Sequence, residues 1–87
     1  MKIKAIGKTS NLEDFDLAED LEIEFSHTVE NQYEFTHKNN KYFFELKNCS
    51  ILNNNSIIID GFITNNECVG KIVFEFSSDL EKPLDKI

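Results

Sequence analysis

The sequence predicts a mainly β protein: an antiparallel sheet of five or six strands, a meander or small barrel-like sheet, with one short N-terminal helix. Apolar and polar residues alternate with a period of two over most of the chain, which is the pattern of half-buried strands. Asparagine-rich segments, which are typical of turns, separate these stretches. Because the connections are short, neighbouring strands must be antiparallel, since parallel neighbours need long crossovers.

The chain has 87 residues, which is enough for one domain with a modest core. We expect this domain to span residues 1–77 and a polar tail to span 78–87, where Pro83 discourages regular structure. The hydrophobic content of 40%, including eight Phe, is that of a folded chain rather than of a disordered acidic one. The sequence shows neither a membrane-spanning run nor a secretory signal, so we expect a cytoplasmic protein.

The N-terminal third is expected to form a strand and then the helix. Residues 2–7 alternate as a strand, and the helix is predicted over residues 11–20. Ser10 and Glu13 have the spacing of a capping box at its start. A structured acidic loop is the competing interpretation of the same segment. The apolar residues that recur there at helical spacing are Leu12, Phe15 and Ala18.

Residues 21–37 are expected to form two strands with a turn near residues 30–32, because the stretch is too long for one strand. Glutamates occupy its even positions and are expected to face outward. The odd positions carry the residues expected to face inward: Leu21, Ile23, Phe25, Val29, Tyr33 and Phe35.

Three further strands are expected, with turns at residues 39–40 and 65–66. The first of them has Phe43 on the face opposite to its other apolar residues. This strand is therefore covered on both sides, or it carries an exposed aromatic ring. Gly61 falls inside the second of these strands, where a glycine more often marks a bulge than an active-site turn.

The acidic residues are unevenly distributed. Nine of the sixteen lie between Thr9 and His37, a window that contains no Lys or Arg, whereas the rest of the chain holds all nine Lys. Like charges on neighbouring strands repel one another, and without interleaved lysines this repulsion is not relieved. A basic partner would supply the missing cations. The alternative is a solvated face that only keeps the protein soluble.

We therefore expect a small protein inhibitor that blocks a basic partner, in the first place an immunity protein that neutralises a nuclease-type bacterial toxin. An anti-defence protein, such as a DNA-mimicking anti-CRISPR, is the alternative, and a structural or oligomer-forming subunit is the alternative from another class. Direct binding of nucleic acid is disfavoured, because the chain has no Arg and no basic patch. The residues expected to bind the partner are Glu13, Asp14, Phe15, Asp16, Glu19, Asp20, Glu22, Glu24 and Phe43.

We expect no enzyme, metal or cofactor, since no catalytic or nucleotide-binding motif is present. His27 and His37 are expected to be half-buried and hydrogen-bonded. Together with Cys49 and Cys68 they would be a zinc ligand set, but they lack paired ligand spacing. The cysteines are expected to be reduced and packed as small hydrophobes, with a disulfide as the alternative. A calcium site is disfavoured for want of the EF-hand glycine and glutamate; it would use Asp14, Asp16 and Asp20.

Overall fold

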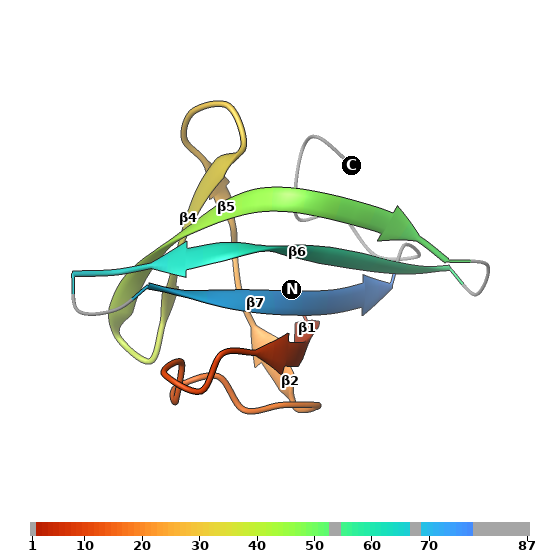
Figure 1. Cartoon of the computed structure of the whole chain (residues 1–87), viewed down its shortest axis with the longest axis horizontal. Helices are drawn as coiled ribbons and strands as arrows, with labels where there is room; N and C mark the ends of the chain where they lie inside the picture. The colour runs from red at the N-terminus through yellow and green to blue at the C-terminus, as the bar shows by residue number, and fades with distance from the viewer. Residues whose placement is uncertain (1, 53–54, 67–68, 78–87) are drawn as a thin grey trace.

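Seven antiparallel strands form one curled sheet, a half-barrel, in the part of the chain that the computed structural model describes, which is residues 2–52, 55–66 and 69–77 (Figure 1). The strands are β1 (Lys2–Lys8), β2 (Asp20–Glu22), β3 (Ser26–His27), β4 (Gln32–His37), β5 (Asn40–Ile51), β6 (Ser56–Thr64) and β7 (Val69–Ser77). They lie side by side in the order β2-β1-β7-β6-β5-β4-β3. The predicted antiparallel meander is confirmed from β3 to β7, and β1 then adds to the outer side of β7.

The predicted helix over residues 11–20 is wrong, and the competing interpretation, a structured loop, is the observed one. The amides of Leu12 and Phe15 each bond to the carbonyl three residues earlier, so two separate turns bury these side chains. Beyond them the chain runs along β1, where the Ala18 amide donates to the Ala5 carbonyl at 2.9 Å. Contacts with the sheet thus replace a short helix, which is only marginally stable by itself. We call residues 9–19 the acidic loop.

The strand count exceeds the prediction because residues 21–29 do not form one strand. They contribute β2 and β3, which are the two opposite edge strands of the sheet. Only residues 23–25 connect them, and such a link spans at most about 14 Å. The sheet must therefore curl until its two edges nearly meet. We call the line between these edges, crossed by residues 23–25, the seam.

The concave face of the sheet encloses a largely aromatic core. Phe25 extends from the seam into this core, where its ring lies 5.2 Å from that of Phe35 and 6.0 Å from that of Phe74. The residues predicted to face inward are buried or packed against the core, except Val29, which is 60% exposed in the β3–β4 turn. The fully or almost fully buried aromatic residues are Phe15, Tyr33, Phe35, Tyr42, Phe44, Phe74 and Phe76.

The turns lie close to their predicted positions. The β3–β4 turn contains Glu30 with a φ of 47°, as expected for residues 30–32. The β4–β5 turn lies one residue earlier than predicted, at Lys38 and Asn39, whose φ values of 50° and 66° match a two-residue type I′ hairpin. The bulge predicted at Gly61 is confirmed on the facing strand, where the register of β5 shifts between Leu46 and Asn48. A Cβ at Gly61 would overlap the carbonyl oxygen of Glu45.

Two further expectations concern segments outside the described residues: the polar tail at 78–87, and any pairing of Cys49 with Cys68. Within the described residues, Cys49 is an exposed free thiol rather than a packed one, because β5 extends there beyond the core. The same part of the chain contains no helix of the length and apolar character needed to cross a membrane.

Candidate functional site

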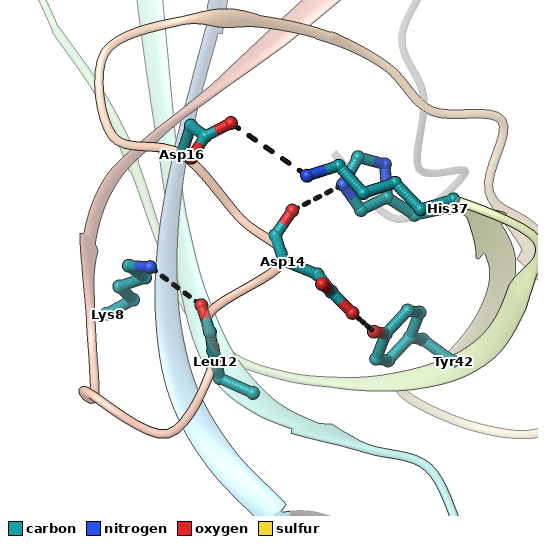
Figure 2. A network of polar contacts seen from close by, with 7 residues as sticks. Lys8, Leu12, Asp14, Asp16, His37 and Tyr42 are labelled. Atoms are coloured by element: carbon teal, nitrogen blue, oxygen red, sulfur yellow. Dashed lines mark hydrogen bonds and ion pairs between the residues drawn. The ribbon is translucent and has the colours of Figure 1, made fainter.

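The acidic loop is held against the sheet by hydrogen bonds from residues of β1, β4 and β5 (Figure 2). The Lys8 ammonium donates to the carbonyl of Leu12 at 2.7 Å. The Nε2 of His37 lies 2.8 Å from the backbone oxygen of Asp14, and the Tyr42 hydroxyl donates to the Asp14 carboxylate at 3.1 Å. The loop backbone is therefore fixed, and its exposed carboxylates are presented from an ordered support.

The first residues of the loop are fixed to β7, the strand that pairs with β1. The Thr9 amide donates to the Lys71 carbonyl at 3.0 Å, and the Lys71 amide donates to the Thr9 hydroxyl at 3.1 Å. Asn11 donates to the carbonyl of Val69 at 2.7 Å. Gly70 permits this approach, because a Cβ there would come within 2.7 Å of the Leu12 side chain.

Beside the loop, the seam carries a groove of about 330 Å³. Glu22 comes from β2 and Glu24 from the crossing segment, whereas Glu34 comes from β4 on the other side of the seam. Glu22, Glu24 and Ser26 follow one another at every second position, and Glu34 lies opposite Ser26 in the β3–β4 pairing, so the three glutamates reach the same groove. The complete lining among the described residues is Glu22, Glu24, Ser26, Glu34, Phe35, Thr36 and Lys41.

Phe43 borders this groove. It lies directly opposite Glu34 in the β4–β5 register, so both side chains project from the same, convex face. Its side chain is 39% exposed, and the ammonium of Lys41 lies 5.6 Å from its ring centroid. Of the two interpretations left open by the sequence, the exposed aromatic ring is thus the observed one.

The acidic residues between Thr9 and His37, the acidic window, are paired with more lysines than the sequence indicates. The expectation of a surface without interleaved lysines is wrong, because lysines distant in sequence or just outside the window fold next to it. Each of these pairs is exposed to solvent, so each contributes at most about 1 kcal/mol and leaves the surface acidic. The pairs are Asp16 with Lys38 at 3.9 Å, Glu34 with Lys41 at 3.3 Å and Asp20 with Lys4 at 4.0 Å.

The residues predicted to bind a partner divide into three groups. Glu22 and Glu24 line the groove and Phe43 borders it. The carboxylates of a second group are exposed, or partly exposed for Asp14, and do not line the groove: Glu13, Asp14, Asp16, Glu19 and Asp20. Phe15 is fully buried, which contradicts its predicted role as a surface anchor. Its ring stacks on His37 at 4.7 Å and so belongs to the support of the loop.

Glu34 is a groove residue that the predicted partner-binding set omitted. Its even position gives it the same strand parity as Glu22 and Glu24, so alternation alone could have assigned it to the same outward face. Its place in the groove depends on the β3–β4 register, in which it lies opposite Ser26, and alternation alone does not determine that register.

The two histidines bond to separate parts of the backbone, and Cys68 lies outside the described residues. The Nε2 of His27 lies 2.7 Å from the Glu30 carbonyl, and His27 is exposed rather than half-buried as predicted. His37 is partly buried and hydrogen-bonded, as predicted. Within the described residues, no group of three His, Cys, Asp or Glu has the geometry to hold a metal ion.

Comparison with known proteins gives no relative. No protein-family model, curated protein or solved structure matches the chain. The arrangement of its own residues therefore carries the functional argument: an ordered acidic surface, a shallow groove and a bordering aromatic ring.

Proposed function

We propose that this protein is an inhibitor that binds a basic protein partner through the groove at the seam. The observation that carries the proposal is the convergence on one groove of Glu22 from β2, Glu24 from the segment that crosses the seam, and Glu34 from β4. Carboxylates held in this way attract a lysine- or arginine-rich surface and accelerate its association.

The aromatic ring of Phe43 supplies the apolar part of the proposed interface. Interfaces concentrate their binding energy in a few aromatic or arginine residues, and acidic rims mainly affect rate and specificity. A partly exposed Phe next to a groove of glutamates offers both components on one surface. The ion pair between Lys41 and Glu34 is exposed, so a basic residue of the partner can compete for that carboxylate at little cost.

A nuclease-type toxin fits this surface, because an enzyme that holds phosphates needs a basic cleft, which three carboxylates and a Phe can occupy. The protein would then act as its immunity protein. An anti-defence protein that mimics DNA would use the same groove against a nucleic-acid-binding complex. The identity of the captured partner distinguishes the two roles.

The test uses the immobilised chain to capture proteins from lysate of its native host or producing strain, with elution by rising salt. The seam variant is Glu22→Gln, Glu24→Gln and Glu34→Gln. A matched control removes the same three charges elsewhere, at Glu30, Glu45 and Glu75. We expect a basic protein that both the wild type and the control retain, and that the seam variant releases at markedly lower salt.

Inhibition is then measured with the captured protein and a DNA or RNA substrate. Equimolar wild-type chain should suppress cleavage, and Phe43→Ala should weaken the suppression while the variant stays folded. Equal salt elution of the seam variant and its control would contradict the proposal, because the groove would then have no special role. Capture without suppression of nuclease activity would refute the inhibitor function.

A further inference from the structure

One long strand edge of the sheet is open. β4 pairs with β5 only as far as Glu45, and in the part of the chain that the structure describes no strand pairs with residues 47–51 on that side. Figure 1 shows β4 crossing beside the first part of β5 and the remainder of β5 forming the border of the sheet. Such an edge presents unpaired backbone donors and acceptors to solvent.

The other edges of the described sheet are short or covered. β2 and β3 contain three and two residues, which leaves little backbone to pair with another chain. The acidic loop covers β1, where Ala18 donates to the carbonyl of Ala5. At the end of β4, His37 bonds to the backbone oxygen of Asp14 in the same loop. Residues 47–51 of β5 are therefore the exception.

The hydrogen bond of the residue that follows this segment shows which peptide groups face outward. The Leu52 amide donates to Ser56 at 2.8 Å, toward β6. Peptide groups alternate in direction along a strand. Those of Ser50 and Asn48 therefore also face β6, and those of Cys49 and Ile51 face the open edge.

Residues 47–51, the open segment, end in an apolar residue and carry so little charge that two copies can pair without repulsion. Ile51 is 68% exposed and Leu52 is 41% exposed. Lys47 is the single charged residue of the segment, and its ammonium lies 2.9 Å from the Glu45 carboxylate. A two-fold antiparallel pairing centred on Cys49 places Lys47 opposite Ile51, so no like charges face each other.

We infer that residues 47–51 of β5 pair with the same segment of a second copy of this chain, giving a dimer with one sheet that continues across both copies. The backbone groups of Cys49 and Ile51 supply the hydrogen bonds, and each Ile51 lies opposite Lys47 of the second copy. Because Lys47 is its single charged residue, the segment offers little to a charged partner. A second copy matches the unpaired backbone groups and brings no like charges together. This dimer is independent of the proposed inhibitor function, since the groove lies at the seam.

Cys49 provides a direct test of the pairing. Directly opposite residues in a hydrogen-bonded antiparallel pair have Cα atoms about 5.5 Å apart, within the range that a disulfide spans. The experiment uses the Cys68→Ser chain, so that Cys49 is the single thiol, and diamide, which takes up two electrons and two protons as two thiols become one disulfide. Partial burial raises the pKa of the Cys49 thiol, so the reaction is run at mildly alkaline pH.

We expect a covalent dimer on a non-reducing gel, and sedimentation of the unoxidised wild type should show a dimer fraction that rises with concentration. Ile51→Lys places a lysine opposite Lys47 of the second copy and should lower the cross-linking rate by about tenfold or more, since about 1.4 kcal/mol of lost affinity gives that factor. The control is Val69→Lys, the same kind of change at a residue that is 63% exposed outside the open segment.

A monomer at every concentration would overturn the inference. So would a dimer whose cross-linking responds equally to Ile51→Lys and Val69→Lys, because it would then form through another surface. The Glu→Gln variant of the seam should dimerise like the wild type. The seam variant should lose partner capture and keep the dimer, whereas Ile51→Lys should lose the dimer and keep partner capture. Measuring both properties in both variants therefore shows which of the two proposals fails, if one does.

Discussion

Two phenylalanines that the sequence treats alike, Phe15 and Phe43, should respond in opposite ways to truncation. Phe15 has no exposed surface, and its ring has four ring neighbours, including Tyr42 at 5.1 Å and Phe74 at 6.4 Å. Phe43 is 39% exposed on the convex face. Substitution of Phe15 by Ala therefore tests whether the acidic loop is anchored in the core, and substitution of Phe43 by Ala is the comparison at an exposed position.

The expected magnitudes follow from burial. Removing a fully buried Phe costs about 3–5 kcal/mol, and the dense aromatic surroundings of Phe15 favour the upper half of that range. Phe43→Ala loses partial burial and the contact with Lys41, which together amount to about 1 kcal/mol. A domain of 87 residues has a total stability of about 4–13 kcal/mol. Phe15→Ala can therefore remove most of the stability, whereas Phe43→Ala cannot.

The assay is urea unfolding followed by far-ultraviolet circular dichroism, with Phe15→Leu as a milder variant in case Phe15→Ala does not fold. We expect the midpoint to fall strongly for Phe15→Ala, less for Phe15→Leu, and little for Phe43→Ala. A loss below about 1 kcal/mol for Phe15→Ala would refute the reasoning. It would mean that the loop is not packed on the core and that its carboxylates have no ordered support.

Two further predictions test how the loop is held. Gly70→Ala should lower the free energy of unfolding by about 1–3 kcal/mol in the same urea assay, because the new Cβ meets the loop at under 3 Å; Gly7→Ala is the control, since its Cβ would make only ordinary contacts at 3.6 Å. An equal loss in both would contradict the close packing at Gly70. Tyr42→Phe should cost about 1 kcal/mol through the lost bond to the Asp14 carboxylate. A double-mutant cycle with Asp14→Ala should show coupling between the two residues, and strict additivity would exclude the bond in solution.

The proposed groove and the proposed dimer edge arise from one property of the fold, the unequal length of its strands. Short β2 and β3 let the sheet curl until a three-residue link can join its edges. Long β5 extends beyond β4 and leaves an unpaired border.

Strand parity was readable from the sequence because it is a local property. Alternation identified Ile23, Tyr33 and Phe35 as inward-facing, and each of them is buried. The asparagine-rich turns were located within about one residue, since two-residue hairpins need residues that tolerate positive φ. Gly61 indicated the bulge, because its side-chain-free position accommodates the Glu45 carbonyl.

Tertiary contacts decided the conformation of the acidic loop and the exposure of the two phenylalanines. The spacing of Leu12 and Phe15 is compatible with a helix and with two turns, and bonds from Lys8, His37 and Tyr42 favour the turns. Those donors lie on strands that the local pattern could not place beside the loop. The exposure of Phe43 and the burial of Phe15 were likewise not decided by residue type.

The sequence by itself determined which residues face inward, where the chain turns and how unevenly its charge is distributed, because each of these depends on neighbours within a few positions. The tertiary structure alone decided that Glu34 meets Glu22 and Glu24 and that lysines fold against the acidic window. These contacts join residues from separate strands. They depend on the register and order of the strands in the whole sheet, which no local pattern encodes.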